Sequence, residues 1–329
     1  MPIMYRQDCA GERCRPPHRL HTASHRGAIV SKQASETYRT PHTRRAALFV
    51  SVVGVLLAPA LVAGAALPLA RASVTATGAQ AGGESGLPSL SSDGTYVAFE
   101  SSAPNLVLND TNLVPDIFVK NTVTGTVTRA SVASDGQQAG SASQQPAISA
   151  TGRYVAFESY AANLVSGDTN GTWDVFVKDT ATGGVIRVST ATSGAEANAG
   201  SYAAAISADG RYVAFESDAS NLVPGDTNGK IDVFVKDTVD GDITLVSSAA
   251  GGLAGDSESY APAVSGDGRY VAFESLSTNL VPGDTNGKRD VFVKDMQAGT
   301  VTRVSVDASG TQGTAPSAHA SISSDGRYV

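Results

Sequence analysis

One acidic loop sequence recurs four times in the chain and carries the oxygen groups best suited to binding a ligand. Its copies, here called the DTN loops, are DTNLVPD (110–116), DTNGTWD (168–174), DTNGKID (226–232) and DTNGKRD (284–290). Oxygen-bearing side chains at positions 1, 3 and 7, with a glycine that permits a sharp turn, can surround a hard cation such as calcium. The three glycine-containing copies therefore predict calcium ligands, which are Asp168, Asn170, Asp174, Asp226, Asn228, Asp232, Asp284, Asn286 and Asp290.

Ordinary turn formation is the alternative explanation of the same loops. Their glycine stands at position 4, whereas an EF-hand loop has it at position 6, and no glutamate stands at position 12. The first copy has Leu113 in place of the glycine. Aspartate and asparagine side chains also hydrogen-bond their own backbone in turns, and the last aspartate of the loop opens a strand. Calcium binding and plain turns are therefore both open.

Trp173 is the only tryptophan of the chain and lies in the second DTN loop. Because tryptophan is over-represented among the residues that anchor a binding partner, Trp173 is a candidate partner-binding residue. The alternative is that its ring covers the edge of its own sheet.

Catalytic motifs are scarce in this sequence. It contains no G-x-S-x-G and no H-E-x-x-H motif, and His319 is the only histidine after residue 42. One glutamate recurs at the same place in each repeat, which favours a structural role, with an arginine of the fourth strands or a lysine of DVFVK as its partner. These glutamates are Glu100, Glu158, Glu216 and Glu274. The sequence therefore favours a non-enzymatic protein, with an enzyme as the alternative.

The elements that must position these residues come from a 58-residue repeat, marked by Tyr96, Tyr154, Tyr212, Tyr270 and Tyr328. A constant period indicates an array in which each unit packs on its neighbours. In the third copy, four strands are predicted at 203–207, 211–217, 232–237 and 242–248, with hairpin turns at 207–210 and 238–241. Four antiparallel strands per repeat are typical of a β-propeller blade.

The predicted fold class is therefore all-β, a β-propeller of four-stranded antiparallel blades. The propeller is expected over residues 73–329, with four full blades and a partial fifth, as in an apparently truncated reading frame. The repeats are approximately 86–143, 144–201, 202–259, 260–317 and the partial 318–329.

The repeat motifs YVAFES, DVFVKD and TRVSV resemble the WD40-like (PD40) repeat of the TolB-type β-propellers. The turn typical of that repeat is present as Asp93-Gly94, Asp209-Gly210, Asp267-Gly268 and Asp325-Gly326, whereas Thr151-Gly152 departs from it. The resemblance covers about residues 71–329. It implies a propeller that serves as a binding platform or as an accessory domain of a peptidase, and it leaves the function open between them.

The first 72 residues differ in composition from the repeats. Residues 1–45 are basic and without an apolar period, which predicts a disordered leader. Arg44-Arg45 then precede an apolar run at 46–70, so 46–72 is predicted to be a cleaved signal peptide or an uncleaved membrane anchor. The repeats are therefore expected outside the cytoplasm, secreted or in the cell envelope. Contact with a membrane is expected only through residues 46–70 if they stay uncleaved.

Charge narrows the class of partner. Residues 73–329 contain 14 Lys/Arg and 28 Asp/Glu, a formal charge of −14 that disfavours nucleic acid and favours cations or basic partners. The expected function is an exported binding or scaffold module for a protein, peptide or glycan, with possible calcium in the DTN loops. Two alternatives stay open: a propeller enzyme or accessory domain of a hydrolase whose catalytic part is missing, and a structural surface-array protein.

Overall fold

The computed structural model describes residues 70–329. The predicted leader, and all but the last three residues of the predicted signal peptide or anchor, lie outside the described residues. From residue 70 onward the chain forms sixteen strands and no helix. A helix able to cross a membrane is accordingly not found in this range.

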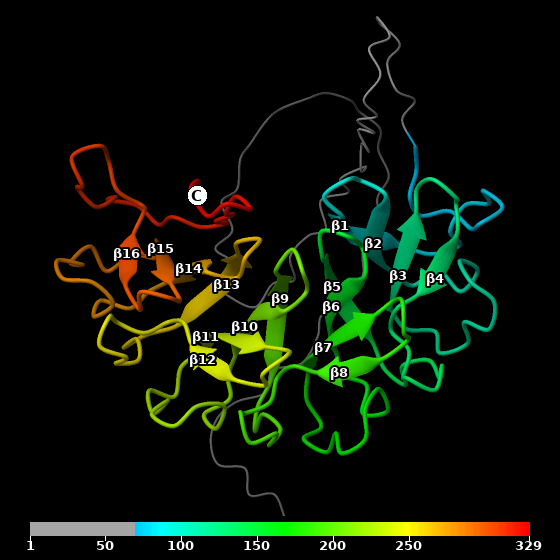
Figure 1. The fold of residues 1–329 in the computed structure, drawn as a ribbon, viewed down its shortest axis with the longest axis horizontal. Coiled ribbons are helices and arrows are strands. Elements are labelled where there is room, and N and C mark those ends of the chain that lie inside the picture. Colours follow the sequence, from blue (N-terminus) through cyan, green and yellow to red (C-terminus); the bar gives the residue numbers. More distant parts are fainter. Residues whose placement is uncertain (1–69) are drawn as a thin grey trace, which may run out of the picture. The chain divides into compact units, whose positions relative to one another are not determined.

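Each repeat contributes four strands, which pair in chain order into one antiparallel sheet (Figure 1). The first strands are β1 (Ser85–Leu90), β5 (Ser143–Ile148), β9 (Ser201–Ile206) and β13 (Ser259–Val264), and the second strands are β2 (Tyr96–Ser101), β6 (Tyr154–Ser159), β10 (Tyr212–Ser217) and β14 (Tyr270–Ser275). The third strands are β3 (Asp116–Asn121), β7 (Asp174–Asp179), β11 (Asp232–Asp237) and β15 (Asp290–Asp295), and the short fourth strands are β4 (Val127–Arg129), β8 (Val185–Arg187), β12 (Ile243–Leu245) and β16 (Val301–Arg303).

The predicted fold class is confirmed, because the described chain is all-β with four four-stranded antiparallel sheets. The four strands predicted in the third repeat are all present. The first of them begins two residues before the predicted start, and the fourth ends at Leu245, three residues before the predicted end. Each hairpin turn contains a positive-φ glycine, Gly210 or Gly241, as the Asp-Gly pairs predict.

The second and third strands form the core of each sheet. In the third repeat Phe215 lies directly opposite Phe234, with ring centroids 5.9 Å apart, and both side chains are fully buried. The same phenylalanine pair recurs in the other three sheets. Alternate residues of β10 are buried on both faces of the sheet, because each sheet is covered by its neighbours.

Consecutive sheets pack face to face as blades of a β-propeller. The second strand of each blade contacts the first strand of the next, and the first strands β1, β5, β9 and β13 also contact one another in sequence. One apolar cluster therefore combines Ile117 of the first blade with Phe157 and Phe176 of the second. The core lies largely between blades, so each repeat depends on its neighbours for burial.

A tyrosine and a glycine connect neighbouring blades at the Asp-Gly turns. Tyr154 packs directly on Gly210 of the next repeat, where any Cβ atom would overlap the ring, and Gly210 has a φ of +81°. The backbone also bridges these turns, since the Ala150 N–H donates to the Ala208 carbonyl at 3.0 Å. Only glycine satisfies both the positive φ and the close approach.

The recurrent glutamates make a second connection between blades. This connection is to backbone N–H groups and not to the predicted arginine or lysine side chains. Glu158 is 4% exposed, and its Oε2 accepts a hydrogen bond from the Ala203 N–H of the next repeat at 2.9 Å. Ala203 lies at a β-bulge in β9 with a φ of +50°, which turns its N–H away from its own ladder. Equivalent bonds join Glu100 to Gln145 and Glu216 to Ala261.

The lysines of the third strands form a third connection, in the opposite direction along the chain. Lys178 Nζ donates to the carbonyls of Val132 and Ala133 in the preceding repeat at 2.9 and 3.3 Å. Burial lowers the pKa of Lys178. Lys120 donates in the same way to the Val74 carbonyl at 3.2 Å, so the segment before β1 supplies the contact that a preceding repeat supplies elsewhere.

The last described residues keep the repeat's turn but form no strand. Within 304–329, Ser323 N–H donates to the Tyr328 carbonyl at 2.9 Å, as in the other Asp-Gly turns. The Gly266 N–H of the fourth repeat donates to the Ser324 carbonyl at 2.9 Å. The partial fifth repeat therefore packs on the fourth through its turn.

Candidate functional site

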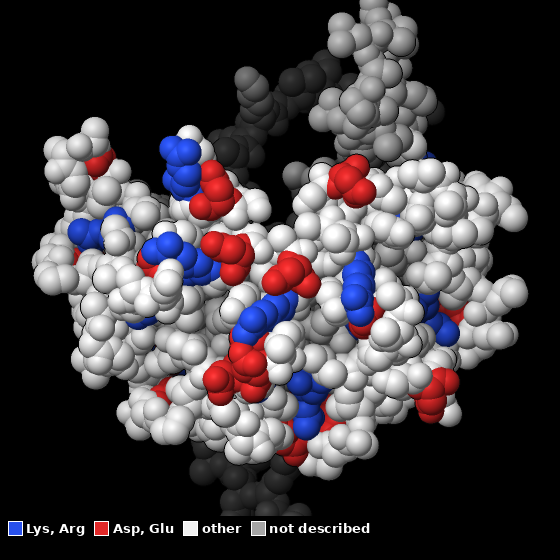
Figure 2. Space-filling view, viewed as in Figure 1, with Lys and Arg blue, Asp and Glu red and all other residues white. Residues whose placement is uncertain are grey.

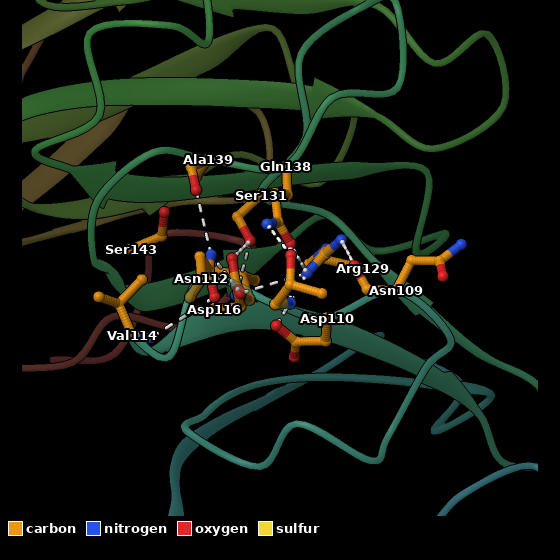
Figure 3. Close-up of polar contacts among 12 residues, drawn as sticks. Asn109, Asp110, Asn112, Val114, Asp116, Arg129, Ser131, Gln138, Ala139 and Ser143 are labelled. Atoms are coloured by element: carbon orange, nitrogen blue, oxygen red, sulfur yellow. Dashed lines mark hydrogen bonds and ion pairs between the residues drawn. The ribbon is translucent and has the colours of Figure 1, made fainter.

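The DTN loops lie at one end of the blades, between the second and third strands. In the first repeat, Asp116 opens β3 and is fully buried. Its Oδ1 accepts a hydrogen bond from Ser131 Oγ at 2.5 Å, and its Oδ2 accepts one from Asn112 Nδ2 at 2.9 Å (Figure 3). Asn112 also donates to the Ala139 carbonyl at 3.0 Å. The last aspartate and the asparagine of the motif therefore lock the loop onto the sheet.

An arginine of the fourth strand fills the centre of this loop. Arg129 Nη1 lies 3.0 Å from Asp110 Oδ1 and 3.5 Å from Asp116 Oδ2, and it donates to Gln138 Oε1 at 2.9 Å. Its Nη2 donates to the Asn109 carbonyl at 3.2 Å. Figure 3 shows the guanidinium between these groups. Four oxygen atoms, three of them from residues 109–116 and one from Gln138, thus surround one guanidinium, and we call this arrangement the guanidinium cage.

The second and fourth repeats build the same cage around Arg187 and Arg303. Arg187 Nη1 lies 3.1 Å from Asp168, and Arg303 Nη1 lies 3.2 Å from Asp284. Burial and the nearby Asp174 raise the pKa of Asp168 to about 6, although Arg187 opposes this rise. In both repeats the predicted calcium ligands therefore lie around an arginine.

The third repeat keeps the acidic groups of the cage but not its cation. Leu245 stands where the other repeats have arginine, and Ala254 stands where they have Gln138, Glu196 and Gln312. Asp226 is 5% exposed, and neither of its carboxylate oxygens has a hydrogen-bond partner. Burial raises the pKa of Asp226, and the Asn228 backbone N–H opposes that rise without reaching hydrogen-bond geometry.

Asp232 of the same loop is also perturbed. Burial, with a smaller contribution from the neighbouring Asp226, raises its pKa to about 6 against the opposing hydrogen bonds from Ser247 and Asn228. Two buried carboxylates of this loop thus interact electrostatically, and Leu245 supplies no positive charge between them, an arrangement that favours a proton or a cation.

The nine predicted calcium ligands are brought together within each loop, although most of their polar atoms already have partners. Each asparagine uses Nδ2 on the last aspartate and Oδ1 on a backbone N–H, as Asn228 does with Asp232 and Lys230. In residues 70–329, no group of three or more His, Cys, Asp or Glu side chains is placed to hold a metal. Calcium binding at these residues stays a prediction.

Trp173 lies beside an aromatic residue that the sequence reading did not single out. Its ring meets that of Tyr160 edge to face, with centroids 5.9 Å apart, and Tyr160 is 47% exposed. Trp173 itself is half-buried, and its carbonyl accepts a hydrogen bond at 2.9 Å from the N–H of Ser201, the first residue of β9 in the next blade. Comparison of equivalent positions among the repeats identifies both aromatics, because no other repeat has an aromatic residue at either.

Charged side chains outside the cages form local pairs. Figure 2 shows basic and acidic residues next to one another across the visible face. Arg211 lies 2.7 Å from Asp237 and also over the Tyr212 ring, and the second and fourth repeats have equivalent pairs. Surface clefts of about 450 Å³ lie between the blades at the end that carries the Asp-Gly turns, opposite the DTN loops, and one of them is lined by Tyr154, Arg211 and Val239.

The fold and these loops define a β-propeller-type repeat protein with an arginine-filled loop in three of its four complete blades. The structure is similar to TolB from Acinetobacter baumannii, with a TM-score of 0.41 and 19% identity over 68% of this chain and 43% of that one. It is also similar to a TolB candidate from Agrobacterium tumefaciens, with a TM-score of 0.44 and 17% identity over 74% of this chain and 70% of that one.

A further similar structure is an oligogalacturonate lyase in complex with manganese, with a TM-score of 0.40 and 14% identity over 68% of this chain and 53% of that one. No family model matches the chain, and neither does any curated protein. The chain spans less than half of the Acinetobacter protein. The fold class accordingly rests on its own four sheets.

Proposed function

We propose that the chain is an exported, non-enzymatic β-propeller that binds a protein, peptide or glycan partner at the end of the blades that carries the DTN loops. The Tyr160–Trp173 pair supports this proposal, because it is the place where exposed aromatic surface breaks the repeat. The equivalents of Tyr160 are Ser102, Asp218 and Leu276, and the equivalents of Trp173 are Pro115, Ile231 and Arg289.

Physical chemistry favours a binding role for this pair. Aromatic side chains offer large contact area at low cost in conformational entropy, and they dominate the energy of many interfaces. The pair also sits on a rigid base, since Trp173 precedes the buried Asp174 and is bonded through its carbonyl to the next blade. A preorganised aromatic surface loses little conformational entropy on binding.

The location outside the cytoplasm is part of the proposal. It rests on the basic-then-apolar order of residues 44–70. Fusing residues 1–72 to a reporter that is active only after export tests it. An inactive fusion in cells that express the chain's own export route would refute it.

The binding role is tested by probing peptide and glycan arrays with the labelled full chain. The variant W173A should lose the signals that the wild type gives. V239A is the matched control, because Val239 is 70% exposed and lies in the turn at the opposite end of β11. Arrays that give no signal with the wild type, or equal signals with W173A, would contradict the proposal.

A further inference from the structure

The third DTN loop contains a buried acidic site that the proposed function does not use. In the other three repeats a first aspartate, a last aspartate and a backbone carbonyl point their oxygens at one guanidinium. The first aspartate lies 3.0–3.2 Å from the arginine Nη1, and the last aspartate lies 3.5–3.8 Å from it. The carbonyls of Asn109, Gly167 and Gly283 accept from Nη2 at 3.2, 3.0 and 3.4 Å.

In the third repeat the same three oxygen donors are present as Asp226, Asp232 and the carbonyl of Gly225. Leu245 replaces the arginine of the other repeats. Ala254 replaces the glutamine or glutamate whose side chain accepts a hydrogen bond from the arginine Nη1 there. The carboxylate of Asp226 nevertheless stays 95% buried, with both oxygens lacking a partner. A buried carboxylate without a partner is costly, so this site requires a compensating cation or a proton.

We propose that the third DTN loop binds one calcium ion through Asp226, Asp232 and the Gly225 carbonyl, in the place that a guanidinium takes in the other repeats. Carboxylate and carbonyl oxygens are the ligands of a hard cation, and water completes the shell. Calcium accepts this irregular geometry, whereas magnesium demands a near-ideal octahedron. With two carboxylates, the expected Kd is on the order of 10⁻⁴ to 10⁻³ M, the range of extracellular modules.

Isothermal titration of the EDTA-treated full chain with CaCl₂ at pH 7 tests the number of sites. The proposal predicts one calcium per chain. Binding of three or four ions would show that the arginine-filled loops also bind calcium and would overturn the argument from the missing guanidinium. No calcium binding up to about 10 mM, well above the Kd expected for such a site, would overturn the proposal itself.

Two variants identify the site. D226N should abolish binding, whereas D284N, in the otherwise similar fourth loop with Arg303, should leave one calcium bound. Binding retained by D226N or lost in D284N would overturn the assignment.

The double variant L245R/A254Q keeps the test valid if D226N fails to fold. It rebuilds the guanidinium cage, so it should raise the melting temperature in EDTA and abolish calcium binding. For the wild type, calcium at about 10 mM should raise the melting temperature by roughly 2–5 °C, and magnesium should raise it less. A calcium-dependent rise of equal size in L245R/A254Q would contradict the site.

Discussion

At the scale of single residues, the same acidic DTN motif occurs in two electrostatic settings, with and without a neighbouring arginine. In three repeats the carboxylates surround an arginine, and in the third they interact with each other without an arginine. The difference accompanies the residue at position 245, which is leucine here and arginine in the other repeats, and which is nineteen positions after Asp226 in sequence.

The first prediction concerns pH. Burial raises the pKa of Asp232 to about 6, and burial also raises the pKa of Asp226. A carboxyl that keeps its proton longer in the folded state stabilises the protein below its unfolded pKa and loses that contribution as pH rises through the folded pKa. In EDTA, the free energy of unfolding should therefore fall between pH 4 and pH 7, by about 1–3 kcal/mol from Asp232 alone, and Asp226 should add to the fall.

Urea unfolding in EDTA at pH 4.5, 5.5 and 7 measures this dependence. D226N should make this dependence shallower, because the variant removes one titrating group and the charge that acts on Asp232. A free energy of unfolding that rises steadily over this range would contradict the assigned pKa directions.

At the scale of elements, the contacts between blades carry the stability of the fold. The variant G210A introduces a Cβ that overlaps the Tyr154 ring and also strains a φ of +81°, so it should cost about 2–4 kcal/mol. G241A is the matched control, with a φ of +79° and open space around the new Cβ, and should cost about 1 kcal/mol. Equal losses in chemical denaturation would show that the tyrosine contact contributes nothing.

The recurrent glutamate gives a second test at this scale. E158A leaves the partly buried Ala203 N–H without its acceptor and should cost about 1–3 kcal/mol. E158Q keeps an acceptor oxygen and should cost less than about 1 kcal/mol. Both are measured by urea unfolding at pH 7. An equal cost for the two variants would mean that the bond between blades is not the source of the effect.

The strands could be predicted because their signals are local. RYVAFES and DVFVKD carry their own alternation, and the Asp-Gly pairs mark the turns. The contacts of Glu158 and Lys178 could not be predicted, since their partners are backbone groups 45 and 46 residues away. The bulge at Ala203 could not be predicted either, because nothing in the sequence marks an alanine that adopts a positive φ.

The candidate site could be predicted only in part. The loop motif located the acidic residues, and the single tryptophan located the aromatic surface. The arginine partners lie on another strand, so the motif alone could not separate a filled cage from an open one. Comparison of equivalent positions among the repeats shows which loop lacks the arginine, at Leu245, and which repeat has the additional aromatic residue, at Tyr160.

At the scale of the whole molecule, the repeats supply a common scaffold, and function is expected where they differ. The interblade contacts of Tyr154, Glu158 and Lys178 recur in neighbouring repeats. The Tyr160–Trp173 pair and the third DTN loop are departures from that pattern. The scaffold therefore positions a few distinctive groups at one end of the blades.

The most direct test of this account is a titration that uses Trp173 as its probe. Because Trp173 is the only tryptophan, its fluorescence reports on the proposed surface alone. The tightest ligand from the peptide and glycan arrays should change this emission saturably, and W173A should bind it at least about tenfold more weakly. Unchanged emission on binding, together with equal affinity of W173A, would show that the partner binds elsewhere and would contradict the account.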